Sequence, residues 1–318
     1  MGSGRWSPDT YHARTTARTS AGKDVFDYSN DAVSSGQLRP HQTLDPQGLG
    51  IRESRDSVEH PDSNSIIISL DVTGSMGAVV RAIHDDLPQL HELILGHKYI
   101  ADPQIMFAAV GDATCDRVPL QVGQFESDNR MDQNLENMIL EGGGGGQKTE
   151  SYELMFYVAA RHTGIDCWDK RRRKGYLFMI GDEMAYPTVK RAEVNGLIGR
   201  ELEADIPIEK LIAEVQERYH IYYLIPGGAS YGSDQQILGY WNKLLGPGRV
   251  IKLESPEDTS ECIGLTIGMN EGAITMSDGV AQLQRRGLVA RTVDRISQAL
   301  GSLVTARPTV AATRPRRL

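Results

Sequence analysis

One short segment constrains the fold more than any other part of this 318-residue chain. Residues 66–71 run from three consecutive isoleucines to Asp71, and a helical pattern begins a few residues later. Such a run has no solvated face, so it predicts a strand buried on both sides, as in parallel sheets. Asp71, Thr73 and Ser75 stand at alternating positions on the turn that follows, which gathers one carboxylate and two hydroxyls at the end of the strand.

Apolar strands and helical patterns continue to alternate along the chain. Strands are expected at residues 104–111, 175–181, 220–225 and 249–253, with helical periodicity between them. Residues 117–125 alternate polar and apolar side chains, which is typical of an edge strand. The order predicts an α/β fold with a doubly wound, mostly parallel central sheet, helices on both faces and one antiparallel edge strand.

The composition predicts one domain with extensions at both ends. Hydrophobic residues make up 40% of the chain, which is enough for a substantial core. Residues 1–62 are polar and lack sustained apolar periodicity, so we expect a partly disordered N-terminal extension. Residues 63–272 are expected to form the domain, residues 273–305 a helical extension, and residues 306–318 a disordered tail.

Charge and cysteine usage bear on location and partners. A formal net charge of −8 argues against general affinity for nucleic acid. No stretch approaches the ~20 apolar residues that span a bilayer, and no apolar leader precedes the domain. Three scattered cysteines, Cys115, Cys167 and Cys262, suit a reducing compartment. We therefore expect a cytoplasmic protein that has no membrane partner.

The oxygens of the Asp71 turn favour a divalent cation as ligand. A helix N-terminus alone attracts anions, but the Asp71 carboxylate reverses that preference. Mg²⁺ requires near-octahedral oxygen coordination, and sheets of this type bind ligands at the carboxyl ends of their strands. Asp112 and Asp182 also follow predicted strands.

Each of these residues also has a simpler interpretation. Asp71 or Thr73 could cap the helix that follows, since both types favour such positions. Asp112 could be an ordinary loop residue. Glu183 could be a solvated loop charge or could accept a hydrogen bond from a ligating group. The glycines at 142–146 could form a flexible linker, or could let the backbone approach a ligand closely.

The motifs resemble those of a von Willebrand factor A (vWA) domain with a metal-ion-dependent adhesion site (MIDAS). The family's first motif is Asp-x-Ser-x-Ser, and residues 71–75 read DVTGS, with Thr in place of the first Ser. Its second loop gives a Thr after a Gly-rich stretch, where this chain offers Thr149, with Glu150 or Ser151 as alternatives. Its third loop gives an Asp after a core strand, which Asp182 fits. The resemblance covers roughly residues 64–272.

The resemblance implies a site for protein binding. Its metal ligands would be Asp71, Thr73, Ser75, Thr149 and Asp182, around Mg²⁺ with Mn²⁺ or Ca²⁺ as alternatives. One coordination position stays open in the family, and an Asp or Glu of a protein partner fills it. Intracellular proteins of this kind often act as adaptors for an ATPase or a large complex, which is an analogy at the level of the fold.

A Mg²⁺-dependent hydrolase or phosphoryl-transfer enzyme is one alternative function. The sequence lacks a Gly-x-x-x-x-Gly-Lys-[Ser/Thr] loop, an Asp-x-Asp start and a Gly-x-Ser-x-Gly elbow. No histidine stands in an obvious base position, and His84 and His91 are expected on the surface of the first helix. We therefore expect binding without catalysis.

Association with nucleic acid through the basic run at residues 170–174 is the other alternative. Charge runs are usually solvated loops, and no interleaved aromatic residue indicates base stacking. We therefore do not expect nucleic acid as a partner.

Overall fold

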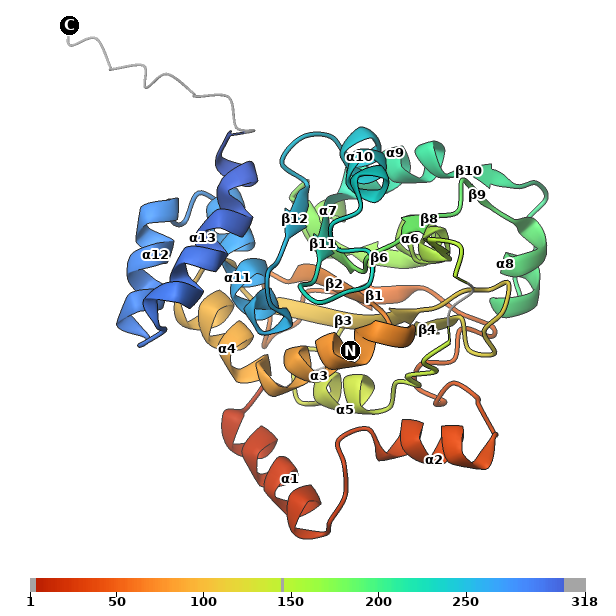
Figure 1. The fold of residues 1–318 in the computed structure, drawn as a ribbon, viewed down its shortest axis with the longest axis horizontal. Coiled ribbons are helices and arrows are strands. Elements are labelled where there is room, and N and C mark those ends of the chain that lie inside the picture. Colours follow the sequence, from red (N-terminus) through yellow and green to blue (C-terminus); the bar gives the residue numbers. More distant parts are fainter. Residues whose placement is uncertain (1–3, 144–145, 306–318) are drawn as a thin grey trace, which may run out of the picture.

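The computed structural model describes residues 4–143 and 146–305, apart from the side chains of Ser75, Val304 and Thr305. Its centre is a six-stranded sheet in the order β12-β11-β7-β2-β3-β4 (Figure 1). Neighbouring strands from β12 to β3 are parallel, and β4 is antiparallel to β3 at one edge. An α/β fold with a mostly parallel sheet is thereby confirmed. The strands are β2 (Asn64–Asp71), β3 (Pro103–Val110), β4 (Leu120–Val122), β7 (Gly175–Ile180), β11 (Tyr219–Ile225) and β12 (Val250–Lys252).

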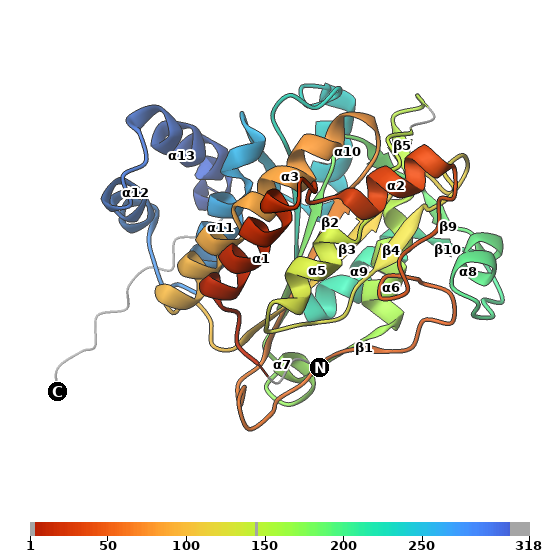
Figure 2. The ribbon, with the colours of Figure 1, turned by 90° about the horizontal axis from the view of Figure 1, so that it is seen from below.

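Successive residues of β2 belong to two separate hydrophobic clusters, because side chains alternate between the faces of a sheet. Ile66 and Ile68 pack in the first cluster, and Ile67 packs in the second. Helices contribute to both clusters (Figures 1 and 2). The first includes side chains of α3 (Gly77–Asp85), α4 (Leu87–His91), α5 (Arg130–Glu136), α11 (Thr259–Asn270), α12 (Met276–Arg285) and α13 (Ala290–Thr305); the second includes side chains of α6 (Tyr152–Arg161), α8 (Arg191–Leu197), α9 (Ile208–Arg218) and α10 (Gln235–Leu245).

The helical segment after β2 is interrupted near Pro88. A 3₁₀ turn at Gly74–Met76 leads into α3, which ends at Asp85, and α4 begins at Leu87. Pro88 lies in the first turn of α4, where its missing N–H costs no helical hydrogen bond. A π-helical turn at Glu92–Gly96 follows.

The N-terminal segment is more ordered than its composition predicts. Residues 1–62 were expected to be weakly structured, but they contain α1 (Pro8–Ser20), α2 (Asp27–Ser35) and β1 (Arg52–Ser54). Tyr11 and Phe26 are buried in the first hydrophobic cluster. The guanidinium of Arg14 pairs with the Glu136 carboxylate of α5 at 2.8 Å. A few side chains therefore attach this segment to the domain. So few apolar contacts produce no periodic pattern in the sequence, which is why the segment was not predicted to be ordered.

The same segment covers two histidines that were expected at the surface. Tyr11 donates a hydrogen bond to the carbonyl of His84 at 3.0 Å. The ring of Trp6 stacks on His91 with centroids 4.4 Å apart. His84 and His91 are consequently buried, which corrects the prediction of surface hydrogen bonds.

The C-terminal extension is helical, as α12 and α13 show. A capping box between Thr275 and Asp278 opens α12. Asp258 and Arg295 form a two-pronged ion pair at 2.7 and 2.8 Å, which ties α13 to the start of α11. The tail predicted at residues 306–318 lies outside the described residues. None of the helices described is long and apolar enough to cross a membrane.

Several short elements lie outside the central sheet. β1 pairs in parallel with β6, and two further two-stranded pairs, β5 with β8 and β9 with β10, connect loops. The remaining elements are β5 (Thr149–Glu150), β6 (Thr163–Ile165), α7 (Asp166–Asp169), β8 (Met184–Ala185), β9 (Thr188–Val189), β10 (Ile206–Pro207) and a 3₁₀ turn at Pro256–Asp258.

Candidate metal centre

Asp71 is the last residue of β2, and its side chain is fully buried. Its Oδ1 accepts hydrogen bonds from the backbone N–H of Thr73 at 2.8 Å and from the Thr73 hydroxyl at 2.6 Å. Its Oδ2 accepts a hydrogen bond from the phenol of Tyr152 on α6. The Asp71 carboxylate is thus fixed at the carboxyl end of the sheet.

Helix capping does not explain these residues. α3 has Met76 at its N-cap and no side-chain capping bond. Thr73 precedes the 3₁₀ turn, but its side chain makes no capping bond there either. The third residue of the motif, Ser75, has a side chain outside the described part of the chain.

Asp182 lies at the same end of the sheet as Asp71, just after β7. β2 and β7 are paired in register up to Leu70 and Ile180, so Asp71 and Gly181 continue adjacent strands. A Cβ at Gly181 would lie 3.3 Å from Oδ2 of Asp71 and would collide with the Tyr152 phenol. Asp182, which is 3% exposed, accepts a hydrogen bond from the backbone N–H of Tyr231 at 2.8 Å.

The second loop reaches the same end of the sheet through β5. Thr149 pairs with Met184 and Glu150 with Ala185, immediately after Asp182 and Glu183. The Thr149 side chain is half-buried, whereas Glu150 is fully buried. Within the described residues, neither carboxylate oxygen of Glu150 has a hydrogen-bond partner.

Ser151 has a different role. Its hydroxyl accepts a hydrogen bond from the backbone N–H of Ala113 at 2.9 Å, and its own N–H donates to the carbonyl of Gly111. Ser151 therefore holds the loop after β3, and Thr149, Glu150 and Ser151 all stay candidates from the second loop.

Asp71, Glu150, Asp182 and Glu183, which we call the carboxylate cluster, are all at least nine-tenths buried. Burial, with a smaller contribution from the charge of Asp182, raises the pKa of Asp71 to about 6. Burial, followed by the charge of Asp71, raises the pKa of Glu183 to about 7 and that of Glu150 to about 10. Burial also raises the pKa of Asp182. Each shift reflects the cost of placing negative charge here without a compensating cation.

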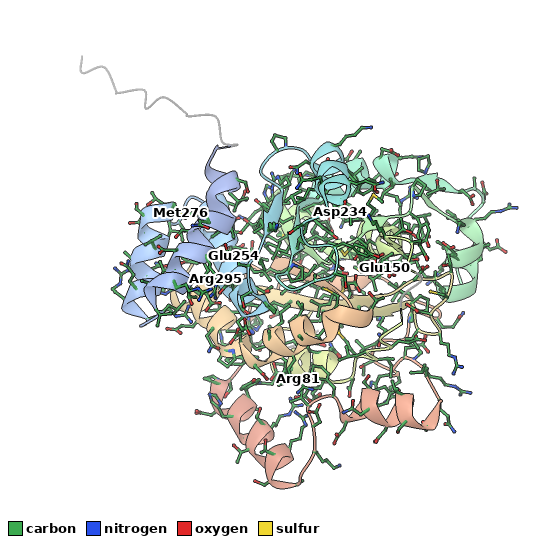
Figure 3. All side chains as sticks on the ribbon, in the orientation of Figure 1. Arg81, Glu150, Asp234, Glu254, Met276 and Arg295 are labelled. Atoms are coloured by element: carbon green, nitrogen blue, oxygen red, sulfur yellow. The ribbon has the colours of Figure 1, made fainter. Side chains whose placement is uncertain are left out.

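Basic side chains near the cluster are engaged elsewhere. Lys148 pairs with Asp234, the N-cap residue of α10, at 2.6 Å, and its ammonium lies 5.4 Å from the Tyr231 ring centroid. Figure 3 labels Glu150 and Asp234. Among the residues described, no lysine or arginine forms an ion pair with any member of the carboxylate cluster.

The glycine run brings its backbone against the Asp71 turn. The N–H of Gly74 donates to the carbonyl of Gly143 at 2.9 Å, and the N–H of Gly142 donates to the carbonyl of Val72 at 3.4 Å. A Cβ at Gly143 would lie 2.6 Å from Oδ1 of Asp116. Close backbone approach therefore accounts for glycine at this end of the run.

Asp112, at the end of β3, is satisfied by its neighbours. Its Oδ1 accepts hydrogen bonds from the N–H and the hydroxyl of Thr114 at 2.8 and 2.7 Å. Its Oδ2 accepts hydrogen bonds from the Gln147 amide and from the Tyr186 phenol, the latter at 3.1 Å. These contacts favour the interpretation of Asp112 as a structural loop residue.

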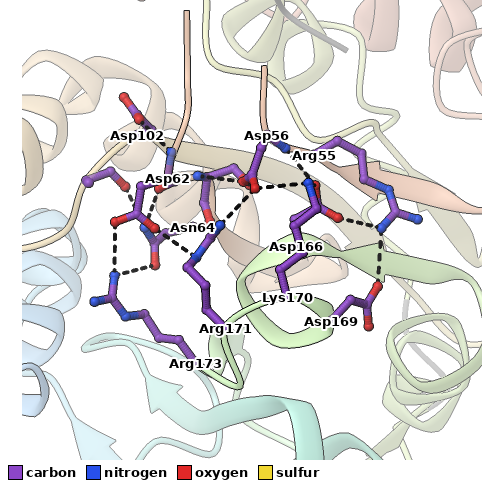
Figure 4. A network of polar contacts seen from close by, with 12 residues as sticks. Arg55, Asp56, Asp62, Asn64, Asp102, Asp166, Asp169, Lys170, Arg171 and Arg173 are labelled. Carbon is purple, nitrogen blue, oxygen red and sulfur yellow. Dashed lines mark hydrogen bonds and ion pairs between the residues drawn. The ribbon is translucent and has the colours of Figure 1, made fainter. Parts of the chain in front are cut away.

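Three residues of the basic run at 170–174, Lys170, Arg171 and Arg173, form ion pairs (Figure 4). Lys170 contacts Asp166 at 2.7 Å, and Arg171 contacts Asp56 at 2.8 Å and Asp62 at 2.9 Å. Asp56 and Asp62 come from the N-terminal segment. Part of the run is therefore paired with acids of the N-terminal segment, while Lys170, Arg172 and Arg173 stay exposed, as a solvated loop would be.

The donor chemistry fits a hard divalent cation. The carboxylate cluster and the Thr73 hydroxyl supply only oxygen, which suits Mg²⁺, Mn²⁺ or Ca²⁺ better than ions that prefer nitrogen or sulfur. Both carboxylate oxygens of Glu150 lack a hydrogen-bond partner among the described residues. No group of three or more His, Cys, Asp or Glu residues in the described ranges converges closely enough to hold a metal by itself. Hydroxyls, water or side-chain rotation would thus complete the coordination.

Sequence reasoning missed two features of this site. Tyr152 fixes Asp71, but a tyrosine at the start of a helix carries no distinguishing signal. The repeat of Asp-x-Thr at Asp71 and Asp112 was visible in the sequence and could have shown that one motif ends two adjacent strands.

No protein-family model and no curated protein matches the chain. Proximal thread matrix protein 1 (PTMP1) from the mussel byssus is similar in structure, with a TM-score of 0.41, 10% identity, and coverage of 71% of this chain and 47% of that protein. One structure of that mussel protein has a zinc-occupied MIDAS motif. The pilus adhesin SpaC from Lactobacillus rhamnosus GG is similar with a TM-score of 0.47, 9% identity, and coverage of 70% of this chain and 32% of the adhesin. The chain thus spans less than half of either protein.

Proposed function

We propose that this chain is a binding domain of the vWA type that depends on a divalent cation. Asp71, Thr73, Ser75, Thr149 and Asp182 are the proposed ligands, with Mg²⁺ as the ion and Mn²⁺ or Ca²⁺ as substitutes. An Asp or Glu of a protein partner completes the coordination. We further propose that its sheet is doubly wound and that the protein acts as an adaptor in the cytoplasm.

The observation that carries the proposal is the carboxylate cluster, which has no ion-pair partner among the described residues. Buried like charges destabilise one another unless they take up protons or a cation. A bound Mg²⁺ would supply positive charge, while the chain's oxygens would orient it. Thr73 can still offer a lone pair, because its hydroxyl proton is directed to Asp71.

Thermal unfolding with and without Mg²⁺ tests the cation. A ligand that binds only the folded chain stabilises it by about 2.7 kcal/mol at a hundredfold excess over Kd. We expect the wild-type protein to melt at higher temperature in Mg²⁺ than in chelator. Asp71→Asn and Asp182→Asn should abolish this response, and Asp182→Asn should leave stability in chelator unchanged or raised because it removes a repelling charge.

Glu261→Gln is the control, since it neutralises a buried carboxylate on α11 that lies outside the carboxylate cluster. It should keep the full Mg²⁺ response. A full response in both Asp71→Asn and Asp182→Asn would contradict the proposed site.

The partner's role is tested with an acidic peptide. Fluorescence anisotropy should detect binding of an Asp-containing peptide in Mg²⁺ and none in chelator. The same peptide with Asn in place of Asp should not bind. Equal binding of both peptides would contradict completion of the ion by a carboxylate.

A further inference from the structure

Glu150 is a fully buried acid whose carboxylate makes no hydrogen bond among the described residues. Burying an unpartnered carboxyl group costs several kcal/mol, whereas an apolar side chain of similar size would cost nothing comparable. A fold that keeps Glu at this position therefore needs another partner for it.

The residues next to Glu150 contact the carboxyl ends of three strands. Thr149 pairs with Met184, which follows β7, and the Ser151 hydroxyl accepts a hydrogen bond from Ala113 in the loop after β3. The Tyr152 phenol donates a hydrogen bond to Asp71 at the end of β2. The charges that act on Glu150 accordingly include those of Asp71, Glu183 and Asp112.

We propose that Glu150 is itself a ligand of the cation, so that the chain carries its own competitor for the partner's acid. This inference rests on the proposed function. Asp71, Asp182 and Glu150 together would supply three negative charges to a doubly charged ion. An incoming carboxylate would then have to displace Glu150, whereas a site of two carboxylates would attract it directly. Side-chain rotation is part of the proposal, because the described acids do not converge at one point.

Glu150→Gln tests the inference, since it keeps the shape of the side chain and removes its charge. Isothermal titration with Mg²⁺ should show affinity about 10- to 100-fold weaker than in the wild type. At saturating Mg²⁺, glutarate serves as a free carboxylate probe. It should bind the variant at least about tenfold more tightly than the wild type, which corresponds to about 1.4 kcal/mol.

Glu153→Gln is the matched control. Glu153 is equally buried and lies three residues further on, but its carboxylate accepts a hydrogen bond from the backbone N–H of Tyr186. It should leave both the Mg²⁺ and the glutarate affinities unchanged. Glu150→Met provides a second variant that fills the space without oxygen, and it should match Glu150→Gln in both titrations.

The outcomes separate this inference from the proposed function. If Asp182→Asn loses the Mg²⁺ response and Glu150→Gln retains wild-type affinity for Mg²⁺ and glutarate, Glu150 is only a buried acid and the inference is wrong. If Asp71→Asn, Asp182→Asn and Glu150→Gln all retain the Mg²⁺ response, the cation site itself is wrong.

Discussion

The carboxyl ends of β2 and β3 carry the same three-residue pattern, Asp-x-Thr, on adjacent parallel strands. In both, Oδ1 of the Asp accepts hydrogen bonds from the N–H and hydroxyl of the Thr two residues later, at 2.6–2.8 Å. The surroundings differ. The second oxygen of Asp112 accepts hydrogen bonds from Gln147 and Tyr186, whereas Asp71 lies among other buried carboxylates.

This difference shows that the motif builds the turn and the neighbours determine its chemistry. Amide and phenol donors stabilise the charge of Asp112 without an ion. Around Asp71, the Tyr152 phenol is a donor, but the remaining acids add negative charge. The proposed cation is accordingly assigned to the end of β2, and none is proposed for the end of β3.

Gly181→Ala should produce the largest effect. The new Cβ would collide with the Tyr152 phenol, which α6 holds inside the core, so we expect a loss of about 3 kcal/mol in the free energy of unfolding. Gly111→Ala is the counterpart before Asp112, but its Cβ would meet only the carboxylate end of Asp116 and should cost less. Urea denaturation of both variants measures the difference. Equal losses would show that the two turns are equally constrained.

A buried acid outside both turns separates the effect of burial from that of a cation. Burial raises the pKa of Glu261 to about 7 from its ordinary value of 4.5, and the charge of Asp86 adds to the rise. Between pH 4.5 and about 7 the folded state therefore binds more protons than the unfolded state. The free energy of unfolding consequently falls as the pH rises through this range. Glu261→Gln should remove roughly 2 kcal/mol of that fall. Denaturation at pH 4.5 and 7.5 measures it, and an unchanged fall would contradict the assignment.

The two phenols give a matched pair of variants. Tyr152→Phe removes a buried donor to Asp71 and should cost about 2 kcal/mol, as expected for a hydrogen bond to a charged group. Tyr186→Phe removes a half-buried donor to Asp112 and should cost about 0.5 kcal/mol, because Gln147 and Thr114 remain. Denaturant titration decides between them. A larger loss for Tyr186→Phe would reverse the proposed contrast.

Gln147→Ala should have the smallest effect on stability. It removes one donor from Asp112 and should cost less than about 0.5 kcal/mol, since water can replace the amide at this exposed position. The Mg²⁺ response in thermal unfolding should stay at the wild-type level. A loss of that response would place the end of β3 within the cation site.

The sequence predicts the central strands well because their apolar runs leave few alternatives. The predicted strand at residues 175–181 agrees within one residue with β7, and that at 220–225 agrees equally well with β11. The pairs β5–β8 and β9–β10 were not predicted. Each contains two residues per strand, so tertiary contacts determine them rather than local pattern.

The site was predictable to the same extent. Asp71 stands at the end of β2 and Asp182 follows β7, which proved to be its neighbour, so their placement at one end of the sheet follows from parallel pairing. The burial of Glu150 was not predictable, because it depends on β5 reaching β8. Their action as metal ligands stays a prediction, as do the domain boundaries at residues 63 and 272.

The docking of the first helix has a consequence for synthesis on the ribosome. Arg18 and its partner Glu136 are 118 residues apart, and Tyr11 and the His84 carbonyl are 73 apart. Because chains emerge from the ribosome N-terminus first, residues 8–20 leave the exit tunnel before His84 and Glu136, which they contact in the folded protein, have been synthesised. Tyr11 therefore stays uncovered until the residues around His84 have been synthesised.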